Sequence, residues 1–194
     1  MAPFVVVLAA VVVWVTGHMN PGVDTWLALA SGRYVLSHGP MLTDPFSFAS
    51  LPAGGSWWHP SGWVNQNWLS HLGLAWLART SGPESLVALK LVLYLAIAAV
   101  LVAGARVRGA GWWLGCLAAA AALACSRDWL EVRPAEATNL MVSCLLLVVA
   151  LASRRPASLW AAVPVMALWC NLHGGFVFGL GVLGLLAGLS VVAV

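Results

Sequence analysis

A long polar segment, residues 18–82, interrupts a chain that is otherwise built almost entirely from apolar runs. It carries four of the five histidines, two of the six acidic residues and half of the twelve tryptophans. Only 8% of the residues are charged and 62% are hydrophobic, whereas a soluble domain carries about 25% charged residues. The sequence therefore predicts a membrane protein whose long loop carries the function.

Apolar runs bounded by glycine and proline predict six membrane-spanning helices. They cover residues 3–18, 84–104, 110–126, 136–152, 157–172 and 175–194. Several are shorter than the ~20 residues that a helix needs to cross hydrocarbon, so the pattern sets their ends only approximately. The predicted fold is an all-α integral membrane protein, a single transmembrane domain over residues 1–194. In it the 18–82 loop precedes a helix bundle at 83–194.

Within the loop, two stretches have the spacing of short amphipathic helices, residues 24–37 and 63–79. In the second, Trp68, Leu72 and Trp76 recur on one helical face. Helices of this kind lie in the plane of the membrane interface with the apolar face down.

Arginines in short turns predict the orientation of the chain. They are Arg106, Arg108, Arg154 and Arg155. Short basic turns stay in the cytoplasm. Alternation of the spans then places the 18–82 loop, the 127–135 turn and the turn at His173 outside, so that most reactive side chains share the extracytoplasmic face.

Asp24 follows Asn20-Pro21-Gly22 and opens the first loop helix. An aspartate at this position commonly caps a helix by accepting free backbone N–H groups. A carboxylate at the membrane surface can also act as a general base toward an acceptor hydroxyl. Residue type alone favours the cap, and the two roles are compatible.

Arg133 stands at the entrance of the 136–152 span, on the same predicted face as Asp24. A guanidinium there suits bidentate binding of a phosphate. The alternative, given equal weight, is a salt bridge to Glu131 or Glu136.

Other polar residues of this face are weaker candidates. Asp44 precedes Pro45, which is ordinary turn chemistry. Asn171 and His173 end a span beside a glycine pair, where the histidine either donates to a phosphate or fixes the turn. His59 has no second ligand at a fixed spacing, so no metal site is predicted.

Two further classes of function are disfavoured. A channel or transporter needs charged groups along its spans, and Lys90 is nearly the only one. It lies near the predicted outer end of its helix, where we expect it to snorkel. The net charge of +3 without a basic run gives no sign of a nucleic-acid partner.

Several short motifs occur in a characteristic order between about Pro21 and Phe178. They are Asp24-Thr25-Trp26, Gly32-Arg33-Tyr34, Thr43-Asp44-Pro45-Phe46-Ser47-Phe48, Trp63-Val64-Asn65, Trp68-Leu69-Ser70, Arg133-Pro134 and Asn171-Leu172-His173-Gly174-Gly175-Phe176. Together they resemble the N-terminal half of bacterial membrane glycosyltransferases of the GT-C type. This family is similar to the protein mannosyltransferases and to the lipid A sugar transferases.

The resemblance implies a multi-pass protein of the bacterial inner membrane with its first loop outside. Such enzymes transfer a sugar from a polyprenyl-phosphate carrier to a hydroxyl of a protein, lipid or glycan, with no metal or other cofactor required. By this resemblance Asp24 is the catalytic carboxylate and Arg133 binds the lipid phosphate. The residues expected to shape the pocket are Asp44, Asn65, Asn171 and His173.

The chain also departs from the family pattern. Members often read Asp-x-Trp-Trp-His-Leu and Asn-His-Glu-Trp-Leu, where this chain has Leu27-Ala28 after Asp24-Thr25-Trp26 and Gln66-Asn67 after Asn65. Full enzymes have about twice as many spans, so we expect a fragment, a chain completed by a second polypeptide, or an inactive relative. The alternative function is therefore a non-catalytic membrane subunit or lipid-binding scaffold, whose loop helices dock a partner subunit or a lipid headgroup.

Overall fold

The computed structural model describes residues 2–17, 22–41, 45–46, 65–125 and 132–192. Every regular element in these ranges is helical and none is a strand, which confirms the predicted all-α class. The α-helices are α1 (Ala2–Thr16), α2 (Val23–His38), α3 (Trp68–Ser81), α4 (Ser85–Val107), α5 (Trp112–Cys125), α6 (Ala135–Ala152), α7 (Ala162–Leu172) and α8 (Phe176–Val192). A 3-10 helix, η3 (Pro156–Ala161), leads directly into α7.

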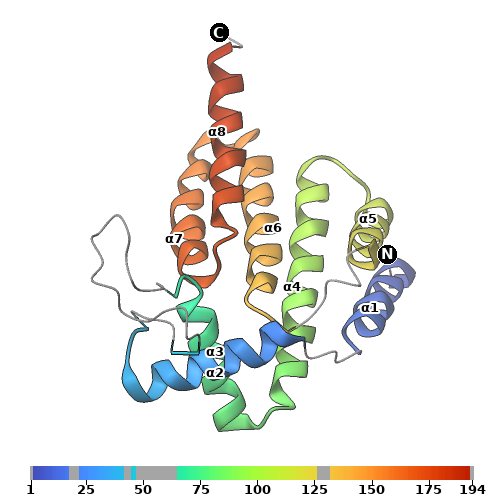
Figure 1. Cartoon of the computed structure of the whole chain (residues 1–194). Helices are drawn as coiled ribbons and strands as arrows, with labels where there is room; N and C mark the ends of the chain where they lie inside the picture. The colour runs from blue at the N-terminus through green and yellow to red at the C-terminus, as the bar shows by residue number, and fades with distance from the viewer. Residues whose placement is uncertain (1, 18–21, 42–44, 47–64, 126–131, 193–194) are drawn as a thin grey trace.

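The helices form an upright bundle with a transverse layer at one end (Figure 1). α4, α6, α7 and α8 stand next to one another, and α2 lies across their lower ends. α3 packs against α2, α4 and α7 and so joins the transverse layer to the bundle. α1 and α5 pack together and against α4.

Side chains are buried mainly where neighbouring upright helices touch. One cluster joins α1, α4 and α5 through Val12, Tyr94, Ile97, Ala98 and Leu123. Another joins α6 to α7 through Met141, Leu145, Val148, Ala162 and Trp169. The core is thus a set of contacts between adjacent helices, while many large apolar side chains elsewhere face outward.

The sequence located these helices well, with one correction. Helix α2 matches the expected 24–37 stretch within one residue at each end. The second loop helix begins at Trp68, so the predicted start at residue 63 is wrong for the described residues 65–67. There Asn65 Oδ1 accepts the backbone N–H of Asn67 at 3.2 Å, and such a local bond competes with helix formation.

Two of the described helices, α4 and α6, are long and apolar enough to cross a bilayer. The other apolar helices in the described part of the chain are shorter, 10–17 residues. The number of six spans stays a prediction.

The transverse layer depends on a close approach of α2 and α3 at Gly32. A Cβ atom added to Gly32 would overlap the backbone carbonyl oxygen of His71 and the Cβ atom of Ala75. Only glycine lets the two helices meet this closely. Because Asp24 lies in the first turn of α2, this crossing also sets how far Asp24 lies from the bundle.

We expect Gly32→Ala to destabilise the protein by about 1–3 kcal/mol, the usual cost of forcing extra volume into a packed contact. A backbone carbonyl cannot move aside as a flexible side chain can, so the helices must separate. The measurement is thermal unfolding of the purified protein in detergent. The matched control is Gly104→Ala in α4, where an added Cβ meets no atom within 4 Å. Equal stability of Gly32→Ala and the unchanged protein would contradict this account of the crossing.

Candidate functional site

The structure brings Asp24 and Arg133 together, although they lie far apart in the sequence. Arg133 Nη1 is 3.5 Å from Asp24 Oδ2. Asp24 lies in the first turn of α2, and Arg133 directly precedes Pro134, which caps α6. The Arg133 side chain is 20% exposed and that of Asp24 is 60% exposed. The pair is therefore accessible from solvent at the end of the bundle that carries α2.

Asp24 is not the N-cap of α2, so that interpretation is wrong. The cap residue is Gly22, whose φ of −70° and ψ of 172° are extended, and no side chain bonds to the free N–H groups as a cap. The helix begins at Val23, one residue earlier than expected, which puts Asp24 inside the first turn. Its carboxylate still suits the positive end of the helix dipole, but its ionic partner is Arg133.

Arg133 pairs with Asp24, a partner that the sequence did not single out for it. Glu131 lies outside the described residues. Glu136 accepts hydrogen bonds from Tyr94 and from Asn139 Nδ2. Arg133 acts on Glu136 as a nearby charge and forms an ion pair with Asp24.

Asn171 joins the end of α7 to α3. Its Oδ1 accepts the indole N–H of Trp68 at 3.0 Å. One turn along α3, the Ser70 hydroxyl donates to the carbonyl oxygen of Leu172 at 2.7 Å. These bonds hold the α7–α8 turn, which carries His173, against the transverse layer.

Asn65 is 4% exposed and its amide donates to His71 Nδ1 at 3.0 Å. The structure therefore places this predicted pocket residue inside the junction of α2 and α3. Burial, reinforced by the nearby His173, lowers the pKa of His71 from 6.5 to about 4. His71 accordingly stays neutral near pH 7 and accepts from Asn65.

The depressed pKa of His71 makes the fold sensitive to acid. Between pH 6.5 and 4 the unfolded chain binds a proton at His71 that the folded protein does not, so stability falls as the pH drops through this window. We expect a loss of at most about 3 kcal/mol from this group. His71→Gln removes the titration and should flatten the decrease in melting temperature between pH 7 and pH 4.5. His38→Gln, at an exposed histidine, is the control. Parallel curves for His71→Gln and the unchanged protein would refute the assignment.

His173 lies in the turn between α7 and α8. Its Nδ1 atom is 2.8 Å from the Thr138 hydroxyl and 3.0 Å from the backbone nitrogen of Gly175. Burial and the positive charge of Arg133 lower the pKa of His173, while Asp24 acts in the opposite direction. His173 thus lies within electrostatic range of the Asp24–Arg133 pair.

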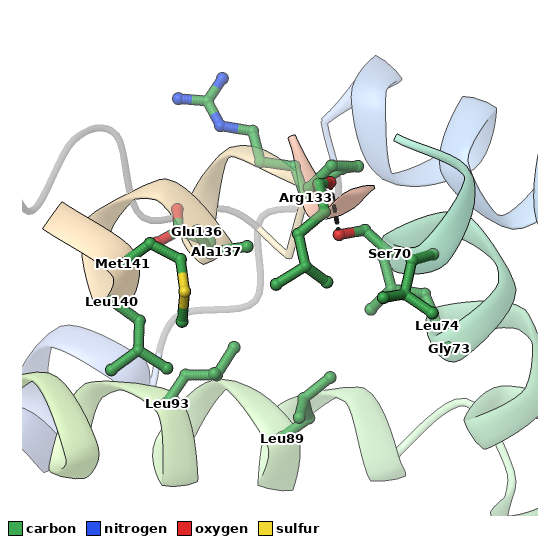
Figure 2. Close-up of a pocket in the computed structure, with 13 residues that line it drawn as sticks. Ser70, Gly73, Leu74, Leu89, Leu93, Arg133, Glu136, Ala137, Leu140 and Met141 are labelled. Atoms are coloured by element: carbon green, nitrogen blue, oxygen red, sulfur yellow. Dashed lines mark hydrogen bonds between the residues drawn. The ribbon is translucent and has the colours of Figure 1, made fainter. Parts of the chain in front are cut away.

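An apolar cleft of about 210 Å³ lies between α3, α4 and α6 (Figure 2). Its apolar walls are Leu69, Leu74, Leu89, Leu93, Pro134, Ala137, Leu140, Met141 and Leu172, with Gly73 on the α3 side. Ser70, Arg133 and Glu136 supply its polar groups. In Figure 2 the Arg133 guanidinium extends away from the apolar side chains. The cleft thus has an apolar interior with a cation at its edge.

Behind this cleft, polar side chains that the sequence did not single out as a group are buried between α4 and α6. Lys90 is 2% exposed, so the expectation that it snorkels to the surface is wrong. It lies close enough to Glu136 to act on that carboxylate electrostatically. Tyr94, one turn along α4, donates its hydroxyl hydrogen to Glu136 Oε2. In the sequence, only the spacing of four residues between Lys90 and Tyr94, which puts both side chains on one face of a helix, could have indicated this group.

Arg133 thus lies at the edge of the cleft with Asp24 as its ionic partner, and the charges of both act on His173. Asn65 and Asn171 hold the supporting helices. Asp44 and His59 lie outside the described residues. An exposed carboxylate paired with a guanidinium beside an apolar cleft can hold an anionic lipid headgroup and accept a proton.

No family model matches the chain, and neither the curated proteins nor the solved structures gave a match.

Proposed function

We propose that the chain is a multi-span membrane glycosyltransferase of the GT-C type, or the N-terminal half of one. It would transfer a sugar from a polyprenyl-phosphate carrier to an acceptor hydroxyl on the extracytoplasmic face. The observation that carries this proposal is the Asp24–Arg133 pair at the edge of an apolar cleft. Together they supply a base, a phosphate ligand and an apolar surface for a lipid chain.

The outward-facing apolar side chains support a membrane environment. Examples are Trp160 in η3 and Phe178 and Leu185 in α8, which are 78%, 69% and 66% exposed. Soluble monomers rarely expose so much apolar surface. We propose that α1, α4, α5, α6, η3 with α7, and α8 span the bilayer, with α2 and α3 in the outer interface. Arg106, in the last turn of α4, and Arg154, just beyond the end of α6, lie at the other ends of these helices, which supports a cytoplasmic location for those ends.

The position of the cleft supports a lipid-linked rather than a soluble donor. A lipid chain lying between α3, α4 and α6 would keep its phosphate at the cleft edge, within reach of Arg133. The guanidinium offers several N–H groups in a fork that matches phosphate oxygens. An ion pair as exposed as Asp24–Arg133 stabilises the protein by at most about 1 kcal/mol, so a phosphate can displace Asp24 from Arg133 at little cost.

In this reaction the acceptor oxygen forms a bond to the anomeric carbon while the bond from that carbon to the phosphate oxygen breaks. Asp24 takes the proton of the acceptor hydroxyl, and Arg133 stabilises the negative charge of the departing phosphate. At 3.5 Å the two side chains leave no room for a sugar between them. Donor binding is therefore expected to separate them, with the sugar occupying the gap.

The cleft can be tested through Gly73, where an added Cβ meets no atom within 4 Å. We expect Gly73→Leu to fill the cleft and to weaken the binding of farnesyl phosphate about tenfold, because displaced apolar contacts of a few methylenes contribute about 1–2 kcal/mol. Binding of inorganic phosphate should not change. The control is Gly104→Leu in α4, where an added Cβ likewise meets no atom within 4 Å. If Gly73→Leu changes the affinity for farnesyl phosphate and for inorganic phosphate equally, the lipid chain does not lie in this cleft.

The function itself is tested by following a product that does not depend on which sugar is moved. Each transfer releases a polyprenyl phosphate. The purified protein in nanodiscs, given polyprenyl-phosphate sugars extracted from its native membrane together with acceptor membranes, should release polyprenyl phosphate. Binding of the donor without any release would favour the alternative, a lipid-binding scaffold or non-catalytic subunit.

A further inference from the structure

His173 is held by donors on one side of its ring. The backbone N–H of Gly175 donates to Nδ1 at 3.0 Å, and a backbone N–H can only donate. Nδ1 must therefore carry a lone pair. In a neutral imidazole the proton then resides on Nε2, which becomes the donor nitrogen.

A buried relay reinforces this assignment. Trp169, which is fully buried, donates its indole N–H to Thr138 Oγ1 at 3.0 Å. Because that oxygen accepts from Trp169, the Thr138 hydroxyl hydrogen is available for His173 Nδ1, 2.8 Å away. Gly175 permits the arrangement, since a Cβ atom there would overlap Thr138 Oγ1. The histidine is thus oriented by one side chain from α6 and one from α7.

Protonation of His173 is disfavoured by the same contacts. An imidazolium would put an N–H at Nδ1 facing the N–H of Gly175, and one hydrogen bond would be lost. The charged groups that act on His173 are Arg133 and Asp24. A positive charge on His173 would also be repelled by one on His71, so the two histidines disfavour each other's protonation. No hydrogen-bond partner of Nε2 occurs among the residues that the structure describes.

We propose that His173 is a fixed Nε2–H donor to a phosphate oxygen of the ligand held by Arg133, and that Thr138 and Trp169 are its positioning residues. This rests on the proposed function for the identity of the ligand. A ring that carries its proton on Nε2 has no lone pair to offer there. His173 consequently cannot act as the general base, which leaves that role to Asp24.

The tautomer can be read directly from the ring nitrogens. Protein labelled with 15N-histidine in nanodiscs would be examined by NMR at pH 7, and the His173 signals assigned by their loss in His173→Gln. We expect a neutral ring protonated at Nε2, whose N–H signal shifts on addition of farnesyl phosphate and not on addition of farnesol. A ring protonated at Nδ1, an imidazolium, or no shift with saturating farnesyl phosphate and inorganic phosphate would overturn the proposal. An equal shift with inorganic phosphate at the same concentration supports the donor role and makes free phosphate the ligand.

Paired variants separate positioning from packing. Thr138→Val keeps the shape but removes the hydroxyl, and Thr138→Ser keeps the hydroxyl. We expect Thr138→Val to weaken the binding of farnesyl phosphate about tenfold, the loss typical of one hydrogen bond to a charged group, and to mix the tautomers of His173. Thr138→Ser should stay within about twofold. If valine and serine behave alike in both readouts, Thr138 does not position the ring.

The two proposals fail independently. The tautomer and the phosphate response are measured without any sugar donor, so they can hold even if no transfer occurs. Conversely, transfer that requires Asp24 together with a His173 ring protonated at Nδ1 would leave the proposed function standing and remove only the role of His173.

Discussion

Asp24→Asn is expected to lower the rate of sugar transfer at least about 100-fold, because the contribution of a positioned general base is about 10²–10⁴-fold. Asparagine has nearly the same shape but cannot take the proton of the acceptor hydroxyl. The measurement is the release of polyprenyl phosphate by the purified variant in nanodiscs. Glu84→Gln, at an exposed acid just before α4, is the control and should leave the rate unchanged.

The same variant should bind the donor phosphate more tightly. In the free protein Asp24 competes for the Arg133 guanidinium at 3.5 Å, and asparagine removes this competitor. We expect the affinity for farnesyl phosphate to rise by up to about fivefold, the equivalent of an exposed ion pair. Tighter binding with slower turnover distinguishes a lost base from a damaged fold. An Asp24→Asn protein that transfers sugar at the original rate would exclude Asp24 as the base.

The second large effect is expected at Arg133. Arg133→Gln should weaken the binding of farnesyl phosphate about 10–100-fold, because charge-assisted hydrogen bonds to a phosphate are worth about 1.5–3 kcal/mol. Arg133→Lys keeps the charge but loses the planar fork, so we expect a smaller loss. Binding is measured by isothermal titration in nanodiscs.

The matched control for Arg133 is Arg79→Gln, which removes an exposed cation from the last turn of α3. It should change the affinity less than about twofold, because a solvent-exposed charge away from the ligand is screened by salt. If Arg79→Gln and Arg133→Gln weaken binding equally, the phosphate is attracted by the general positive charge of the surface and has no specific ligand at Arg133.

The positions of the helices could be predicted closely from the sequence. The apolar runs expected at 84–104 and 136–152 correspond to α4 and α6, because glycine and proline mark their ends clearly. Helix α3 was the exception, since the amphipathic spacing continues upstream of Trp68 while the side chain of Asn65 bonds to the local backbone. Hydrophobic periodicity does not record such competition.

The site could be predicted only as a list of residue types. The sequence placed Asp24 and Arg133 on one face, but their pairing depends on how α2 crosses α3 at Gly32. The relay from Trp169 through Thr138 to His173 was missed because Trp169 and Thr138 look like ordinary apolar and small residues of a helix. Lys90 was wrongly assigned to the surface. The side of a helix that faces its neighbours depends on the packing of the helices, which the sequence of one helix does not show.

The most direct test of the account is to locate the donor phosphate by photocrosslinking. A polyprenyl-phosphate analogue with a photoreactive group next to the phosphate would be irradiated with the purified protein in nanodiscs, and the labelled peptides mapped. We expect labelling of α3 and of the start of α6 around Arg133, and strong reduction of that labelling in Arg133→Gln. Labelling confined to the opposite end of the bundle, at the turns that carry Arg106 and Arg154, would contradict it.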